Sequence, residues 1–302
     1  MGKSLRVAMV SNNYFPFVSG VSVSVDRLRN GLHDLGHSIQ LLVPRYREAW
    51  QDDKSIKRIP TLMAFGEKGE FRLTNPFSVR FRHCLRAFKP DLIHVHHPFW
   101  LGSMGLLMGR RLKVPVVYTY HTRLEHYAHF VPLPGALFRN LISHYLIKHF
   151  SNRCQGVIVP TYSAEEYLRM IGVKTPSLVQ PTGIDVERFA HAEAGELEVL
   201  RKRLAIDPAR KILISVSRIS KEKNIGFMLE ALAELQTQRH EDFHLLLIGD
   251  GPDREAIQYQ IDTLKLTAWV TLVGRCRLIK WRFTITWAIY LCSLLRRKPR
   301  GW

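Results

Sequence analysis

The sequence predicts an α/β protein with two doubly wound parallel sheets, the second of them incomplete. Two observations support this prediction. Short β-branched runs alternate with longer amphipathic stretches along residues 5–179, and a second series of the same kind begins at Lys211. Such alternation is typical of βαβ units built around a parallel sheet.

The first series accounts for a complete Rossmann-like domain. Its strands are expected at residues 5–11, 38–43, 92–96, 114–120, 156–160 and 177–179. Its helices are expected at residues 22–35, 78–88, 102–112, 134–154 and 163–171. Ser163 is expected to cap the last of these helices, with Glu166 three residues later completing a capping box.

The second series is shorter. Strands are expected at residues 212–216, 243–248 and 270–273, and helices at residues 225–237 and 252–264. Three strands fall short of the roughly five or six of an average sheet. We therefore expect a domain over residues 1–185, a linker at about 181–190, a partial second domain over residues 186–274, and a separate tail over residues 275–302.

The charge is unevenly distributed along the chain. The 302 residues hold 44 Lys and Arg against 26 Asp and Glu, a net charge of +18. Residues 275–302 hold 8 of these basic residues and no acid. The excess favours phosphates, nucleic acid or anionic lipid as partners. We expect the tail to be run-on sequence, as a frameshift would give, which leaves an unpaired sheet edge and a truncated protein.

Cysteine usage and hydropathy indicate the compartment. The 4 cysteines show no C-x-x-C spacing, which argues against disulfides and zinc and fits a reduced, cytoplasmic setting. The longest apolar run, residues 283–295, is shorter than the roughly 20 residues that span a bilayer. No membrane span or signal peptide is expected.

The loop after the first strand lacks the G-x-G-x-x-G of dinucleotide sites, which disfavours an oxidoreductase. Gly20 remains, at the start of a helix whose free amides and dipole favour an anion. The alternative is a glycine that only shapes the turn.

Two further motifs follow strands of the second domain. Arg218 and Lys223 lie across a loop that opens a helix, and two cations with a helix dipole suit a departing diphosphate. The alternative is a solvated basic loop. Gly249, Asp250 and Gly251 end a buried strand, and the glycines would let a ring or ribose approach. The alternative is a plain turn.

Histidines end two strands of the first domain. His121 follows the predicted strand 114–120 and is expected to hydrogen-bond a substrate hydroxyl, with a structural role as the alternative. His94, His96 and His97 are interpreted as site-wall and structural residues, so no metal is expected.

Two basic amphipathic stretches, residues 78–89 and 137–150, either contact an anionic membrane surface or place one face in the core and leave a solvated basic face.

Six ordered motifs resemble a known family. They lie at residues 11–16 with 19–21, 90–96, 120–122, 181–185, 217–224 and 249–252. Together they make residues 4–274 similar to family-4 retaining glycosyltransferases of the GT-B fold, above all to bacterial diacylglycerol glucosyltransferases.

The resemblance implies a nucleotide-sugar donor, a lipid acceptor, and neither a cofactor nor a metal. It implies that Arg218 and Lys223 neutralise the donor diphosphate and that His121 contacts the transferred sugar. Gly20 would approach both donor phosphate and acceptor, and the glycine turn at 249–251 would bind the donor.

The stretch 122–130, with Glu125 and Tyr127, resembles the acceptor-side segment of lipid-using members.

The sequence departs from the family at two places. The paired glycine loop reads Ser19-Gly20, and no acidic residue follows Asp262, so the family's Glu-x7-Glu motif is missing.

We therefore expect transfer of a hexose, glucose, from a nucleotide diphosphate sugar such as a UDP-sugar to diacylglycerol with retention, by a truncated chain of weak or no activity. The alternative is a non-catalytic remnant that binds acceptor or membrane. Nucleic-acid binding has only the charge in its favour. The expected location is the cytoplasm, peripherally at the inner membrane face.

Overall fold

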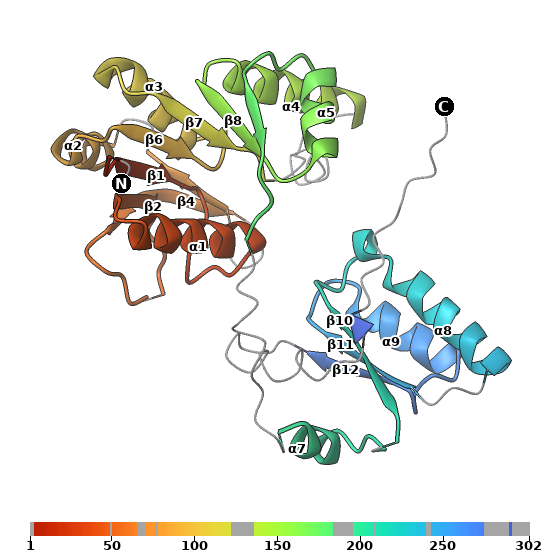
Figure 1. Cartoon of the computed structure of the whole chain (residues 1–302). Coiled ribbons are helices and arrows are strands. Elements are labelled where there is room, and N and C mark those ends of the chain that lie inside the picture. The colour runs from red at the N-terminus through yellow and green to blue at the C-terminus, as the bar shows by residue number, and fades with distance from the viewer. Residues whose placement is uncertain are drawn as a thin grey trace. The chain divides into compact units, whose positions relative to one another are not determined.

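The computed structural model shows two compact units, Met1–Gly183 and Ile184–Trp302, each described here by itself (Figure 1). The predicted boundary after residue 185 and most of the predicted linker fall outside the described part of the chain. The structure describes residues 3–48, 50–65, 71–75, 78–121, 136–183, 196–207, 209–239, 243–274 and 290–291.

The first unit contains a parallel sheet in the order β3-β2-β1-β6-β7-β8-β9. The strands are β1 (Arg6–Val10), β2 (Ser38–Pro44), β3 (Ile56–Ile59), β6 (Leu92–Val95), β7 (Val116–Thr119), β8 (Gly156–Val159) and β9 (Ser177–Val179). The chain starts in the middle of the sheet and winds outward in both directions, which is the predicted doubly wound arrangement.

Helices pack on both faces of this sheet. Alternate residues of β1 point to opposite faces, so the strand contributes side chains to both layers. Val7 and Met9 pack in a cluster with Val25 of α1 (Gly20–Asp34). Ala8 and Val10 pack in the larger cluster of the unit. That cluster includes residues from α2 (Val79–Phe88), α3 (Leu101–Leu112), α4 (Ala136–Ser151) and α5 (Tyr162–Met170).

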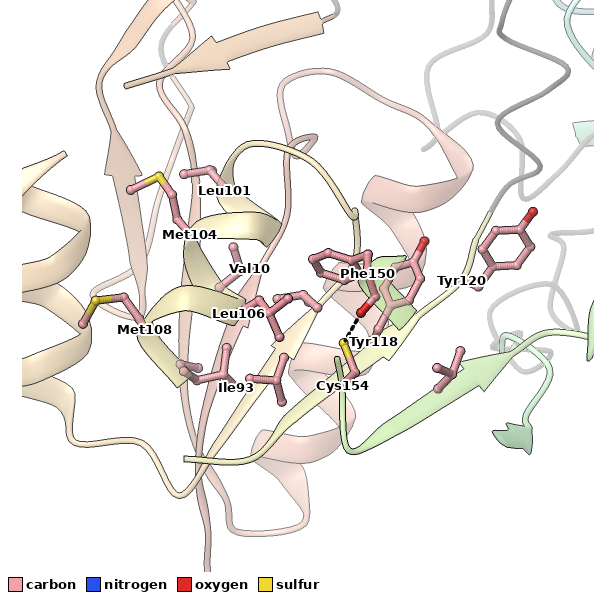
Figure 2. Close-up of a cluster of buried hydrophobic side chains, with 14 of the residues drawn as sticks. Val10, Ile93, Leu101, Met104, Leu106, Met108, Tyr118, Tyr120, Phe150 and Cys154 are labelled. Carbon is pink, nitrogen blue, oxygen red and sulfur yellow. Dashed lines mark hydrogen bonds between the residues drawn. The ribbon is translucent and has the colours of Figure 1, made fainter. Parts of the chain in front are cut away.

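Figure 2 shows the larger cluster, in which side chains of α3 meet those of β1, β6 and β7. At its edge the thiol of Cys154 donates to the carbonyl oxygen of Phe150 at 3.5 Å (Figure 2). Burial raises the pKa of Cys154 to about 12, so this thiol stays protonated and packs as a small apolar group.

The structure corrects two details of the sequence prediction for this unit. The N-cap of α5 is Thr161, whose hydroxyl accepts from the amide of Ala164, and not Ser163. Sequence reasoning also missed β3 and the antiparallel pair formed by β4 (Thr61–Phe65) and β5 (Phe71–Thr74).

The second unit contains a parallel sheet in the order β12-β11-β10-β13. Its strands are β10 (Lys211–Val216), β11 (Phe243–Ile248), β12 (Val270–Gly274) and β13 (Tyr290–Leu291). The prediction of three strands was wrong, since a fourth strand pairs with β10 through Tyr290 and Leu291, which lie opposite Leu213 and Ile214.

Three helices of the second unit are described: α7 (Glu196–Arg203), which the sequence prediction missed, α8 (Ile225–Arg239) and α9 (Arg254–Thr263). Leu229 of α8 and Ile261 of α9 pack against Leu245 and Leu247 of β11. Ile206, which follows α7, covers the other face of the sheet. Within the described ranges, no helix is both long enough and apolar enough to cross a membrane.

Candidate active site

The polar residues of the first unit gather where β1, β6 and β7 end. These strands are parallel neighbours, with Val10 opposite Val95 and Val95 opposite Tyr118. Their carboxyl ends therefore share one edge of the sheet, the edge at which open α/β sheets bind ligands. The loops leaving this edge carry Asn12 and His121.

Four histidines from β6 and the loops after β6 and β7 lie close together at this edge. Nδ1 of His96 and Nε2 of His121 are 2.9 Å apart and share a hydrogen bond. Nε2 of His94 and the hydroxyl of Thr119 are 2.6 Å apart. Nδ1 of His97 accepts from the amide of Asn12 at 3.2 Å.

Burial keeps these imidazoles neutral, because it disfavours the charged form. Loss of contact with water lowers the pKa of His94 and of His97 to about 3, and neighbouring His121 adds to this. Loss of contact with water also lowers the pKa of His121 to about 4. At neutral pH these rings therefore act as neutral hydrogen-bonding groups.

The cluster does not form a metal centre. Within the residues that the structure describes, no three His, Cys, Asp or Glu side chains form a group that could hold a metal ion. The histidines instead contact one another and the neighbouring loops.

Asn12 organises this edge and was missed as a site residue by sequence reasoning. Its side-chain amide donates to the carbonyl of Phe99, and its side-chain oxygen accepts from the amide of Leu101. The side chain thereby ties the loop after β1 to the start of α3. The available signal was a polar residue directly after a buried strand.

Gly20 begins α1, beside the same edge. Ser19 caps this helix by accepting from the amide of Ser22. A Cβ added at Gly20 would meet nothing within 4 Å, so neither packing nor a positive φ requires glycine here. Open space therefore lies before the first turn of α1, whose amides favour an anion.

The predicted acceptor-side residues Glu125 and Tyr127 lie outside the described residues.

In the second unit, the loop between β10 and α8 holds both predicted cations. Arg218 follows β10 and is exposed, and Lys223 ends a short 3-10 helix, Lys221–Lys223, before α8. Among the described residues neither cation forms an ion pair within the 4 Å limit. Both remain available to an incoming anion.

The pKa of Glu222 reflects the positive electrostatic potential of this loop. Burial raises the pKa of its carboxyl group, but the hydrogen bond from Ser220 at 2.5 Å and the charges of Arg218 and Lys223 outweigh that effect, so the pKa lies below its usual value. The loop therefore stabilises negative charge placed beside it.

The glycine turn after β11 packs directly against this loop. A Cβ at Gly249, where φ is +146°, would lie 1.8 Å from the carbonyl oxygen of Ser217, and one at Gly251 would lie 2.1 Å from that of Ile219. The carbonyl oxygen of Asp250 accepts from the amide of Ile219 at 3.1 Å. The glycines thus let two loops meet, and their predicted contact with a donor stays a prediction.

Two Rossmann-like units, each built on a parallel sheet, are the architecture of the GT-B class of glycosyltransferases. Solved structures of this class have the same fold. HepE from Anabaena, in complex with UDP and glucose, gives a TM-score of 0.69 at 15% identity and covers 96% of this chain and 74% of its own. Sucrose-phosphate synthase from Thermosynechococcus elongatus gives 0.68 at 18% identity, over 98% of this chain and 77% of its own.

Sequence comparison identifies the family. The model described as Glycosyltransferase Family 4 matches residues 18–188, and Glycosyl transferases group 1 matches residues 197–295. The second match extends beyond residue 274, where we expect the tail to begin. The chain belongs to glycosyltransferase family 4, as the sequence motifs predict.

Two curated relatives are similar over most of the chain. The alpha-monoglucosyldiacylglycerol synthase of Streptococcus pneumoniae is 34% identical over 89% of this chain. The synthase of the same name from Acholeplasma laidlawii is 30% identical over 89% of this chain. The chain spans 61% of the length of the first relative and 69% of the second.

Proposed function

We propose that the chain transfers glucose from UDP-glucose to the hydroxyl group of diacylglycerol, with retention of the anomeric configuration. The observation on which this proposal mainly rests is the loop of Arg218 and Lys223, where two cations without an ion-pair partner among the described residues stand at the edge of a parallel sheet. The names of the two synthases support glucose and diacylglycerol. The complex of HepE with UDP and glucose supports the nucleotide.

In this reaction the oxygen of the acceptor hydroxyl forms a bond to the anomeric carbon of the sugar. The bond from that carbon to the diphosphate breaks, and the hydroxyl proton leaves to the diphosphate or to water. Negative charge develops on the diphosphate as it departs. Arg218 and Lys223 stabilise that charge, a role for which preorganised cations are well suited.

The first unit supplies the remaining contacts in this proposal. His121 hydrogen-bonds a hydroxyl group of the transferred sugar, and Gly20 leaves room for donor phosphate and acceptor at the start of α1. Glu125 and Tyr127 are proposed on the acceptor side. The turn Gly249 to Gly251 is proposed to contact the nucleotide.

We assign the contact with an anionic membrane surface, at the inner face of the cell membrane, to α4. Leu141, Tyr145 and Leu146 are exposed on this helix, and exposed Lys148 lies on the next turn. Exposed apolar side chains beside cations suit the boundary of an anionic bilayer. In α2, by contrast, Val79 is the one large apolar side chain that is exposed.

One observation favours a second function, binding without turnover. No acidic residue follows Asp262, although the family resemblance places a Glu-x7-Glu motif in that part of the chain. A chain without those carboxylates would keep the acceptor surface and the basic loop but lose contacts to the sugar and the ribose.

Radiolabelled transfer separates the two functions. The purified chain is incubated with labelled UDP-glucose or GDP-mannose, with and without diacylglycerol in vesicles of anionic lipid. We expect labelled glycolipid only from UDP-glucose with diacylglycerol, with an α-linked product by proton NMR. Vesicle binding without labelled product would favour the second function, and labelled lipid only from GDP-mannose would contradict the proposed donor.

A further inference from the structure

The hydrogen bond between His96 and His121 can run in either direction, depending on which ring nitrogen carries the proton. His96 is only 2% exposed, and its Nδ1 lies 2.9 Å from Nε2 of His121. The other ring nitrogen of His96, Nε2, is buried and has no hydrogen-bond partner in the part of the chain that the structure describes. Nδ1 of His121 has no partner among the described residues.

Each neutral imidazole carries one proton, so one ring must donate and the other accept. If His121 donated from Nε2, His96 would carry its proton on its own Nε2. That buried N–H would have no acceptor among the described residues, which disfavours this tautomer. If His96 donates from Nδ1, its Nε2 is a bare acceptor, and buried acceptors without a partner are better tolerated than buried donors.

We propose that His96 is a positioning residue that holds His121 in the tautomer with its proton on Nδ1. This inference rests on the proposed function, in which His121 meets the transferred sugar. The arrangement presents an N–H group and makes His121 specific for a hydrogen-bond acceptor, such as a hydroxyl oxygen of the sugar. His96 itself need not touch the substrate.

His94 and Thr119 lie at the same edge and do not change the direction of the hydrogen bond between His96 and His121. His94 lies beside His96, with ring centroids 4.3 Å apart and the rings tilted by 30°, and forms its own hydrogen bond with Thr119. Loss of contact with water, the largest cause, and the neighbouring histidines hold the pKa of His96 well below its usual value. Both rings of the pair therefore stay neutral at neutral pH, and a single proton lies between them.

Nitrogen NMR of the full chain labelled with 15N-histidine tests the tautomer directly, because ring nitrogens with and without a proton resonate far apart. In the wild-type protein we expect Nδ1 of His121 to be protonated and Nε2 to be bare. A proton on Nε2 of His121 would overturn the proposal. This measurement needs neither donor nor acceptor, and it does not depend on any variant folding.

Substitutions of His96 and His94 test whether the hydrogen bond to His121 affects catalysis. His96→Leu removes the donor and should leave His121 in a mixture of tautomers, with kcat lower by roughly 10- to 100-fold, as for other outer partners that orient a functional histidine. His96→Asn places an amide N–H near the position of Nδ1 and should restore most of this loss. His94→Leu, at a neighbouring histidine that is 4% exposed, should leave the His121 tautomer unchanged.

The outcomes separate the two proposals. A His96→Leu protein with the wild-type tautomer and kcat would overturn the positioning role, even if sugar transfer is established. A wild-type chain with the expected tautomer that transfers no sugar would contradict the proposed function alone.

Discussion

The sheet edges of the two units present polar groups in opposite ways. In the first unit the edge holds histidines that are buried or half-buried, each in contact with a neighbour, and loss of contact with water keeps them neutral. In the second unit the edge holds exposed Arg218 and a loop whose field lowers the pKa of a carboxyl group. Neutral hydrogen-bonding groups tolerate burial, whereas charged groups need water or a counter-ion.

This difference suggests a division of labour. A buried, hydrogen-bonded ring is fixed in position and suits recognition of a sugar hydroxyl. Exposed Arg218 and half-buried Lys223 have no ion-pair partner among the described residues, and they suit the diphosphate. The following predictions test that division, beginning with the largest effect.

Arg218→Ala should lower kcat by roughly 100- to 1000-fold, since it removes a preorganised charge at the leaving group. Lys221→Ala is the matched control. Lys221 is an exposed cation of the same loop, and no contact with the donor is proposed for it. Steady-state transfer assays should show only a small change for Lys221→Ala. Equal losses in both variants would indicate that general positive charge, rather than position, matters.

Gly251→Ala should destabilise the second unit by at least about 2 kcal/mol, because its Cβ would overlap the carbonyl oxygen of Ile219. Gly20→Ala in the first unit should change stability by less than about 0.5 kcal/mol, since nothing lies within 4 Å of its Cβ. Urea unfolding measures both. Equal destabilisation by the two substitutions would contradict the different roles assigned to these glycines.

Acid should destabilise the first unit more than the second. In the first unit, burial lowers the pKa of His94 and His97 to about 3 and that of His121 to about 4. Among the described residues of the second unit, burial lowers the pKa of His244 to about 4. Below about pH 6.5 the unfolded chain binds protons that the folded chain does not. Stability is therefore full above that pH and falls as the pH falls, by up to about 1.4 kcal/mol per pH unit and histidine.

Urea unfolding between about pH 7 and about pH 5, with hydrogen exchange to assign each transition to a unit, measures this slope. His94→Asn should reduce the slope of the first unit by one proton. A steeper slope in the second unit would contradict the assignment of neutral histidines to the first.

Thr161→Ala should destabilise the first unit by about 1 kcal/mol, because it removes the N-cap of α5. Ser163→Ala should have a smaller effect, since Ser163 does not cap the helix. Thermal unfolding compares the two variants. A larger loss of stability in Ser163→Ala than in Thr161→Ala would contradict Thr161 as the N-cap and support Ser163, the cap that the sequence predicts.

The sequence predicts most of the fold because its periodicity is strong. The strand Phe243–Ile248 and the strand Ser177–Val179 lie where the apolar runs predict them. The strand at Ile56–Ile59 was missed because IKRI places two cations between its apolar residues. The strand Tyr290–Leu291 has only two residues, too few to show a period.

The sequence predicts where the candidate site residues lie relative to the strands, but not the contacts between them. Arg218 and Lys223 could be identified from their place after a strand, a local property of the sequence. His96 and His121 follow two neighbouring strands, β6 and β7, so the two rings meet only because these strands pair in this register. The contact of Gly249 with Ser217 also depends on strand pairing, so the sequence around residue 249 does not predict it.

The central claim is that Arg218 and Lys223 hold the diphosphate of the donor. Calorimetric titration of UDP into wild-type, Arg218→Ala and Lys221→Ala proteins tests it most directly. We predict that Arg218→Ala weakens binding by roughly 10- to 100-fold, the value of a hydrogen bond to a charged group, while Lys221→Ala binds almost as the wild type does. Equal affinity of the wild-type and Arg218→Ala proteins would contradict the claim.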